Sequence, residues 1–352
     1  MKKLLLLLPA LLILLAGCPG TPPDQPPQQN ITITHVNVSQ FTVTMETETI
    51  ITGENVIVIN NTQNETNTTA NRSIPDYTFN PNQTLAVYFI NVSYIKDWSP
   101  NASNERQGEA ILLKKGDADI LIDAGPKERA VYLVNFLREK GVDDIDLLVS
   151  THARPENYGG MDTLLDHIDV EMFLWTGYDG GDSAYAAAVQ KAKSESRKSM
   201  ESKYLQNISI NGINILVINP RDGDARFKSI DNDGIVLKIT DRNFSLMTTG
   251  DIAYGAQTLI ANAPDYSPAC NVLQIPNSGL GTGSSQIDVF LVKVKPQSAI
   301  ITGSHFDPAN ERYSLTERLK LRNITYYTNF QNKSTNVVKI VTDGYTYSIL
   351  TS

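Results

Sequence analysis

From residue 85 onward, the apolar residues of the chain gather in short runs, and some of these runs alternate with polar positions. Both patterns are typical of β-strands. Stretches 127–141 and 182–204 space their apolar residues as helices do, and further helical stretches lie near 254–262 and 308–321. This mixture predicts an α/β fold with two sheets and helices outside them. The predicted strands are LAVYFINV, EAILLKK, ADILIDAG, DLLVS, VEMFLW, ISINGINILVI, GIVLKI, FSLMTTGD, CNVLQIP, DVFLV, SAIIT, TYYTNF, VVKIV and TYSIL.

The first residues follow a different pattern. Two lysines precede an apolar run from Leu4 to Leu15, which is too short for the roughly 20 residues that span a bilayer. This layout is typical of a secretory signal, predicted at residues 1–17. The following Cys18 stands where the lipobox of exported lipoproteins, which LAGC resembles, places its lipidated cysteine. The alternative is an ordinary cleaved signal with a chance cysteine. We favour a lipid anchor that holds the protein at the extracellular face of the membrane.

Residues 18–84 are predicted to form a stalk. A Pro/Gln stretch comes first, then an alternating segment that indicates a small β module, then an Asn/Thr-rich spacer. Asn-X-Ser/Thr triplets, the acceptors of N-linked glycans, are frequent there and continue beyond it. Together with the lipobox they suggest a glycosylated cell surface, more typical of archaea than of bacteria. The 13 triplets begin at Asn30, Asn37, Asn60, Asn64, Asn67, Asn71, Asn82, Asn91, Asn101, Asn207, Asn243, Asn323 and Asn332.

Composition limits the partners. The net charge is −8 and no basic stripe is present, which argues against a nucleic-acid surface. Besides Cys18, the chain contains one other cysteine, Cys270, which is predicted to be a buried apolar residue. If Cys18 carries lipid, no disulfide can form within the chain. The expected partners are the membrane, through the anchor, and a surface ligand or protein that the sequence does not name.

Five blocks occur in an order that resembles the metallo-β-lactamase superfamily, and within it the ComEC-type extracellular hydrolase domains of DNA-uptake proteins. The resemblance covers residues 85–352 and implies an αβ/βα four-layer sandwich, with an insertion at residues 93–107. It also implies one or two divalent metals, usually zinc, held by histidines and a bridging carboxylate. The blocks are FINV…QGEAILL, ILIDAG, STHARPENYGG, DNDGIVLKI…FSLMTTGDI and VLQIPNSGLGTGSS.

The positions that match the family's metal ligands are mostly altered. The first histidine is kept as His152, and the bridging carboxylate is kept as Asp251. A further family histidine has a counterpart near His305, in an uncertain register. The chain has four histidines, and His35 and His167 are interpreted as surface residues. The replaced ligands are Arg154, Glu156, Asn157 and Asn277.

Two interpretations of this residual site remain open. In the first, His152, Glu156 and Asp251 hold one divalent cation (Zn, Mn, Mg or Ca), with Asn157 or Asn277 adding amide oxygens. In the second no metal binds, and Arg154 replaces it by pairing with Asp251 or Glu156. A guanidinium about 5 Å from a metal position costs about 3 kcal/mol per unit of metal charge at an effective dielectric constant of 20. We therefore favour the second, with no cofactor.

The altered ligands lead to two functional hypotheses. The leading one is a cell-surface lipoprotein whose catalytically degenerate domain serves binding or scaffolding. The alternative is a metal-dependent extracellular hydrolase, of the phosphodiesterase or nuclease kind, working with a reduced single-metal site. A serine nucleophile finds little support, because Ser284 and Ser285 have no histidine at a defined spacing.

Overall fold

The computed structural model describes residues 84–95, 105–106, 108–279, 286–303, 311–329 and 337–351. The predicted signal, Cys18 and the stalk up to residue 83 lie outside these residues, as do His305, Ser284 and Ser285. Within the described ranges, no helix combines the length and the apolar character that a membrane span requires. The fold described below is that of the predicted domain from residue 85 onward.

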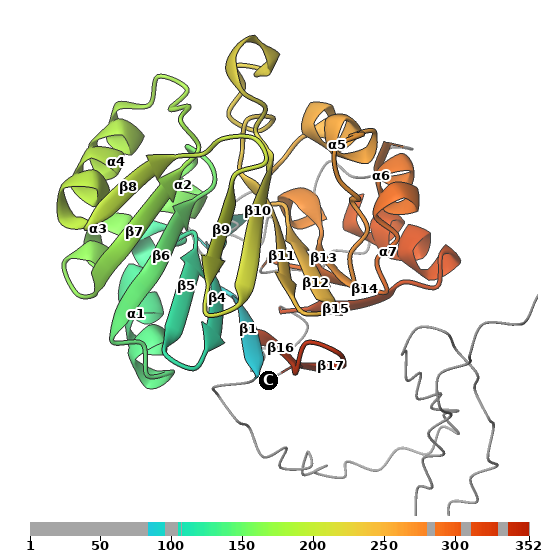
Figure 1. Cartoon of the computed structure of the whole chain (residues 1–352), viewed down its shortest axis with the longest axis horizontal. Helices are drawn as coiled ribbons and strands as arrows, with labels where there is room; N and C mark the ends of the chain where they lie inside the picture. The colour runs from blue at the N-terminus through green and yellow to red at the C-terminus, as the bar shows by residue number, and fades with distance from the viewer. Residues whose placement is uncertain are drawn as a thin grey trace, which may run out of the picture. The chain divides into compact units, whose positions relative to one another are not determined.

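Two mixed sheets form the centre of the domain (Figure 1). The strands β5 to β8 of the first sheet are parallel, and so are β12 to β15 of the second. The first sheet has the order β17 (Tyr347–Thr351), β16 (Val337–Thr342), β1 (Leu85–Ile90), β4 (Ile111–Lys115), β5 (Ala118–Ile122), β6 (Asp144–Ser150), β7 (Asp169–Trp175), β8 (Lys198–Glu201). The second has the order β15 (Thr325–Thr328), β14 (Ser298–Ile301), β13 (Val272–Gln274), β12 (Phe244–Thr248), β11 (Val236–Asp241), β10 (Ile213–Asn219), β9 (Asn207–Ile210).

Helices cover the outer faces of both sheets (Figure 1). On the first sheet lie α1 (Ala130–Glu139), α3 (Met161–Leu165) and α4 (Ser183–Glu195), with the short α2 (Pro155–Tyr158) near them. On the second lie α5 (Tyr254–Ala261), α6 (Gln286–Val294) and α7 (Glu311–Leu321). The described residues also form three 3-10 turns: η2 (Lys127–Arg129), η3 (Gly223–Ala225) and η4 (Pro276–Gly279).

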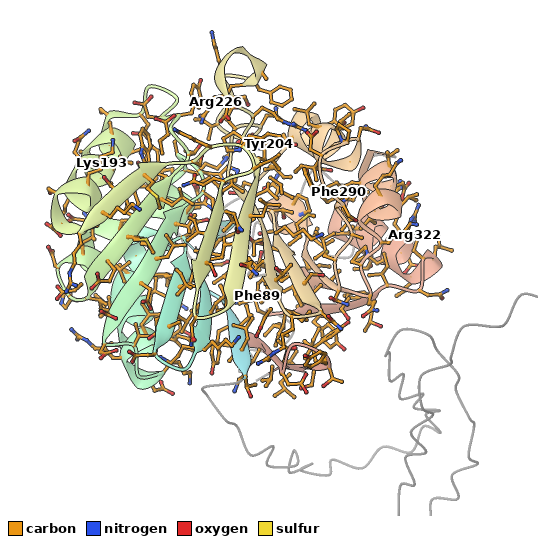
Figure 2. All side chains as sticks on the ribbon, in the orientation of Figure 1. Phe89, Lys193, Tyr204, Arg226, Phe290 and Arg322 are labelled. Atoms are coloured by element: carbon orange, nitrogen blue, oxygen red, sulfur yellow. The ribbon has the colours of Figure 1, made fainter. Side chains whose placement is uncertain are left out.

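Three apolar clusters hold the four layers together. One lies between the sheets and contains Phe89, and one joins the second sheet to its helices and contains Phe290 (Figure 2). The third joins the first sheet to α1, α3 and α4. The layer order is therefore helix, sheet, sheet, helix, which confirms the predicted αβ/βα sandwich.

Two predicted elements are wrong. The stretch DVFLV, predicted as a strand, lies in α6, where Ile287, Phe290, Leu291 and Val294 are buried. Their spacing of three and four residues is helical, but a continuous apolar run hides that period. The helix predicted over 182–204 ends at Glu195, and residues 198–201 form the edge strand β8. Beyond α4 the side chain of Met200 packs toward the cluster between the sheets, and this tertiary contact outweighs helical propensity.

The predicted insertion is partly described. The short strands β2 (Tyr94–Ile95) and β3 (Glu105–Arg106) pair antiparallel within it and form a two-stranded sheet of their own. The residues between these strands lie outside the described ranges. The two short strands therefore belong to neither of the two main sheets.

A buried ion pair joins the two sheets at one end. The Nζ of Lys115, at the end of β4, lies 2.8 Å from Oδ1 of Asp241, at the end of β11. The two side chains are only 5% and 1% exposed, so water screens this pair very little. β1 runs antiparallel to β4, so β1 begins at the end of the sheet where β4 stops. Its first residue, Leu85, pairs with Thr342 of β16. The candidate site lies at the other end.

Candidate functional site

The candidate site forms where parallel strands end. Asp123 follows β5 and His152 follows β6 in the first sheet, while Asp251 and Thr302 follow β12 and β14 in the second. Glu109 comes just before β4, which runs antiparallel to β5 and so starts at the same end. The carboxyl ends of parallel strands are the usual position of sites in α/β folds. The sequence blocks that match the family thus meet in one place.

Asp123 is fixed by three hydrogen bonds. Its Oδ1 accepts from the backbone N–H of Thr151 at 2.8 Å, and its Oδ2 accepts from the Thr151 hydroxyl at 2.5 Å and from Nδ2 of Asn157 at 3.0 Å. Burial nevertheless raises the pKa of Asp123 to about 7. The bonds therefore only partly offset the cost of removing this carboxylate from water.

Glu109 and Asp251 complete a cluster of three carboxyl groups. Glu109 is buried, and its Oε1 accepts a 3.2 Å hydrogen bond from the Thr302 hydroxyl. Its burial, and then the charges of Asp251 and Asp123, raise the pKa of Glu109 well above its usual range. Burial also raises the pKa of Asp251 to about 6, although the Arg154 charge opposes this. The three carboxyl groups therefore keep their protons to a higher pH than exposed carboxyl groups do.

Sequence reasoning did not single out Glu109 or Asp123. Both stand in the matched blocks QGEAILL and ILIDAG, as acids directly beside apolar strand residues. An acid in such a place is rarely buried without a function or a partner. That local contrast is the signal by which they could have been found.

His152 is buried and closed in by backbone. Its Nδ1 lies 2.8 Å from the Thr151 hydroxyl. Because this hydroxyl donates to ionised Asp123, Nδ1 carries the imidazole proton in that state, and Nε2 is left with its lone pair. Nε2 has no partner in hydrogen-bond geometry among the described residues. Burial, and then the Arg154 charge, lower the pKa of His152 to about 3, so the ring is neutral.

Two glycines make room for this imidazole. A Cβ on Gly234 would lie 1.8 Å from Nε2, and a Cβ on Gly250 would lie 2.7 Å from Cε1. Both distances are far below a van der Waals contact, so the ring packs directly against backbone. The atom that would bind a metal is therefore enclosed by the chain.

Arg154 pairs with a different carboxylate from the one predicted. Its Nη2 and Nε lie 2.5 and 2.8 Å from Oδ1 of Asp231, whereas the prediction was Asp251 or Glu156. The reason is that the DNDG loop places Asp231 directly beside the guanidinium, whereas Asp251 is buried deeper in the site. The two side chains are 41% and 34% exposed, so the pair lies at the mouth of the site. Arg154 still acts on Asp251 through space, since its charge opposes the rise in the pKa of Asp251.

The next two residues of the DNDG loop make structural hydrogen bonds. Oδ1 of Asn232 accepts from the backbone N–H of Ala256 at the start of α5, at 3.0 Å. The carboxylate of Asp233 accepts from the backbone N–H groups of Phe227 and Ser229, both at 3.0 Å. These bonds hold the loop against the start of α5 and against residues 227–229.

The other replaced ligands also lie at this end. Asn157 is fully buried and its Nδ2 binds Asp123, while its Oδ1 has no partner among the described residues. Glu156 is half-buried on α2, close enough for its charge to raise the pKa of Asp251. Asn277 has a φ of 50° in the turn after β13, and its backbone N–H donates to the Gly250 carbonyl at 2.8 Å. The structure thus brings all six predicted site residues together.

This donor set does not fit the metal centre that the family resemblance implies. Within the described ranges, no group of three histidine, cysteine or acidic side chains has an arrangement that could hold a metal ion. The imidazole nitrogen that would be the first ligand faces Gly234, and Arg154 brings a positive charge to the mouth. We therefore derive no catalytic step through a metal.

The proton-holding cluster predicts a pH effect that can be measured by substitution. The pKa of Asp123 is raised from 3.8 to about 7, so between these values folded Asp123 keeps a proton that the unfolded chain has lost. Its contribution to stability therefore falls as the pH rises through this window. Relative to the wild type, Asp123→Asn should gain stability as the pH rises from about 4 to about 7, by up to a few kcal/mol at about 1.4 kcal/mol per pKa unit.

Urea denaturation of both proteins across this pH range provides the measurement. His152 acts in the opposite sense, because its lowered pKa costs stability as the pH falls below 6.5. The difference between variant and wild type cancels this contribution. An offset that is the same at every pH would contradict the assigned protonation of Asp123.

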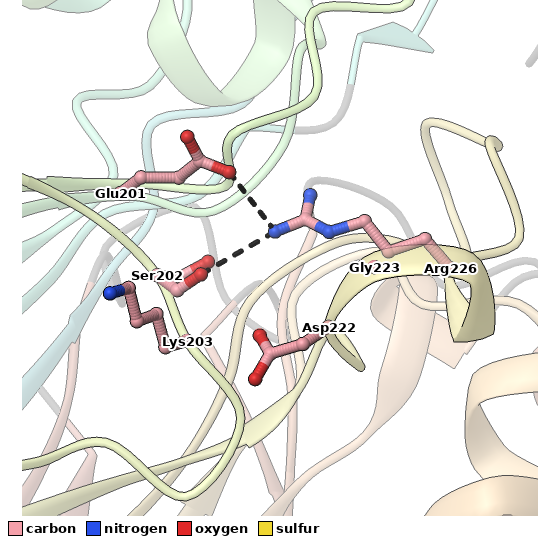
Figure 3. Close-up of a pocket in the computed structure, with 6 residues that line it drawn as sticks. All are labelled: Glu201, Ser202, Lys203, Asp222, Gly223 and Arg226. Atoms are coloured by element: carbon pink, nitrogen blue, oxygen red, sulfur yellow. Dashed lines mark hydrogen bonds and ion pairs between the residues drawn. The ribbon is translucent and has the colours of Figure 1, made fainter.

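A surface cavity of about 410 Å³ lies elsewhere, between the end of β8 and η3 (Figure 3). Arg226 crosses it, with a 3.5 Å ion pair to Glu201 and a hydrogen bond to the Ser202 carbonyl. The two acidic and two basic side chains of its lining balance in charge: Glu201, Asp222, Lys203 and Arg226. None of the residual site residues lines this cavity, so it is separate from the candidate site.

Comparisons with known proteins agree with this arrangement. No protein-family model matches the chain. In sequence, the chain is 25% identical over 181 residues to ComE operon protein 3 of Bacillus subtilis (strain 168). These residues are 51% of this chain but 22% of that protein, so the chain spans only a part of its relative's length. The described residues form an α/β fold with two mixed sheets and helices outside them, as the resemblance implied, and about half of the chain is similar in sequence to ComE operon protein 3.

The solved structures to which the chain is similar differ widely from it in sequence. The metallo-β-lactamase from Hirschia baltica is 16% identical, with 55% of this chain and 85% of that chain covered and a TM-score of 0.36. The Zn²⁺-bound PqqB from Methylobacterium extorquens is 11% identical, with 69% and 97% covered and a TM-score of 0.43. A diphosphatase of the PhnP family is 11% identical, with 73% and 97% covered and the same TM-score.

Proposed function

We propose that this metallo-β-lactamase-fold domain binds or scaffolds a partner at the cell surface without metal-dependent catalysis. The observation that carries the proposal is the enclosure of His152. Its Nε2, the atom that would bind the family's metal, packs against Gly234 and has no room for an ion in that direction. The ion pair between Arg154 and Asp231 at the mouth adds to this, since it places a fixed positive charge near the metal position.

The proposed location rests on the sequence of the N-terminal segment. A signal-like run followed by Cys18 supports export and lipid anchoring, and the frequent glycan acceptors support a surface position. The partner is then a surface ligand or protein. The net charge of −8 disfavours nucleic acid in this role.

A second candidate function is a metal-dependent hydrolase of phosphodiesters or other esters with one oxygen-bound cation. The specific observation in its favour is the cluster of Glu109, Asp123 and Asp251 beside the unpartnered Oδ1 of Asn157. Carboxylate and amide oxygens are the ligands that Mg²⁺, Mn²⁺ and Ca²⁺ prefer. A cation there would keep the carboxyl groups ionised.

Metal analysis separates the two candidates. Purified protein, dialysed in turn against Zn²⁺, Mn²⁺, Mg²⁺ and Ca²⁺, should retain far less than one ion per chain in plasma mass spectrometry. The reason is that the donor atoms do not converge on a common point. A stoichiometric ion that is lost in Asp251→Asn, and kept in the control Asp265→Asn at an exposed carboxylate, would overturn the proposal in favour of the hydrolase.

A further inference from the structure

Four glycan acceptor triplets lie in the described part of the chain, at Asn91, Asn207, Asn243 and Asn323, and the structure treats them differently. We propose that Asn207, Asn243 and Asn323 carry N-linked glycans and that Asn91 does not. This inference rests on the proposed export of the chain. It adds which sites are used and which surface the glycans cover.

In the triplets of Asn207 and Asn323, both the acceptor asparagine and the hydroxyl residue are exposed. Asn207 is the first residue of β9, and both its side chain and that of Ser209 are exposed. Asn323 lies in the turn before β15, with a φ of 56°, and both its side chain and that of Thr325 are exposed. An acceptor amide and its hydroxyl residue are thus accessible together, as the modification of surface loops requires.

In the triplet of Asn243, the acceptor asparagine is exposed but the hydroxyl residue is not fully exposed. Its side chain is exposed in the turn between β11 and β12, and its backbone N–H donates to the Gly344 carbonyl at 2.8 Å. The hydroxyl of Ser245 is half-buried and donates to Oδ1 of Asn271 at 3.0 Å. We therefore expect a lower occupancy at Asn243 than at Asn207 when modification follows folding.

Asn91 is closed by its own hydrogen bonds. Its Nδ2 donates to the Asn329 carbonyl at 3.1 Å, and its Oδ1 accepts from the Ser93 N–H at 3.0 Å. Ser93 is only 6% exposed and Asn329 is fully buried. A sugar on Nδ2 would have to enter the space beside buried Asn329 and break the contact between two distant segments. A glycan added before folding would oppose the formation of this contact. A glycan added after folding would have to break it.

The three open acceptors lie at one end and at one edge of the second sheet, and they leave the candidate site uncovered. Asn243 and Asn323 come before β12 and β15, whereas Asp251 follows β12, so the two acceptors lie at the opposite end of these parallel strands. Asn207 lies on the strand at the end of the sheet order, where a glycan blocks pairing with another chain. Glycans at these positions would protect an edge strand and keep the site end open to a partner.

The test measures occupancy at each acceptor. The full chain with its own leader is expressed in a host that exports and N-glycosylates proteins, and the surface fraction is analysed by glycopeptide mass spectrometry. Glycans are expected at Asn207, Asn243 and Asn323, and unmodified peptide at Asn91. Matched variants are compared by electrophoresis. N207Q, N243Q and N323Q should each migrate faster than the unsubstituted protein by the loss of one glycan, whereas the mobility of N91Q should not change.

Some outcomes would overturn the inference about glycosylation alone, and others would overturn the proposed location as well. Occupancy at Asn91 equal to that at Asn207 would overturn the inference, as would a surface-exposed chain with all three open acceptors unmodified. Both results leave the proposed surface function standing. A chain that stays inside the cell would instead overturn the proposed location and, with it, this inference. Because the peptides of the unsubstituted protein are measured directly, the result does not depend on the folding of N91Q.

Discussion

Replacing Lys115 with methionine should lower the free energy of unfolding by about 3 to 5 kcal/mol, because it leaves the buried carboxylate of Asp241 without its cation. The second oxygen of that carboxylate already has no partner among the described residues. Removing Lys115 would therefore leave both oxygens uncompensated in the interior. Urea denaturation of the purified protein measures this loss. The dependence of the free energy of unfolding on urea concentration should stay the same as in the wild type.

Two further variants test this explanation. In Lys115→Met with Asp241→Leu, both charges are removed, so most of the lost stability should return. Lys191→Met is the matched control at the surface, where Lys191 contacts Asp162 and Asp166, both more than half exposed. Its loss should be about 1 kcal/mol or less. Equal losses at Lys115 and Lys191 would contradict a special role for the pair between the sheets.

Gly234→Ala should lower the free energy of unfolding by about 1 to 3 kcal/mol through overpacking. The new methyl group would lie 1.8 Å from Nε2 of His152, and a ring enclosed by backbone cannot move aside easily. Thermal or urea denaturation measures the loss. The same substitution should leave the secondary structure seen by circular dichroism unchanged.

The double variant Gly234→Ala with His152→Ala provides the control for this result. Because the clash needs both side chains, the double variant should be more stable than the sum of the single losses predicts, by about 0.5 to 3 kcal/mol. Additive losses would mean that His152 does not rest on Gly234. The imidazole would then be free to turn toward a ligand, which would weaken the proposed metal-free function.

The layers of the fold could be predicted from the sequence because each strand carries its own apolar signal. The α6 segment could not, since Ile287, Phe290 and Leu291 stand in a run that suits either a buried strand or a buried helix. Nor could β8, whose side chains are mostly exposed and which forms a strand because the edge of β7 is available to it. In both cases the neighbouring layer decides the outcome.

The candidate site was predictable in its location but not in its contacts. Matched blocks gave the positions of His152, Asp251 and the altered ligands. They could not show that Asp231 would reach Arg154 first, since these residues are 77 positions apart and the outcome depends on how the DNDG loop folds. The enclosure of His152 likewise depends on Gly234 and Gly250, two glycines whose importance appears only when the two sheets are packed together.

The first strand gives the domain a direction. Leu85 begins β1 at the end of the first sheet where Lys115 also lies, and Asp123 and His152 lie at the other end. A tether that pulls on the chain before residue 85 would therefore apply its force to the base of the sandwich. Such a force would act on the end that holds Lys115 and Asp241, so the candidate site lies at the end of the domain away from the load.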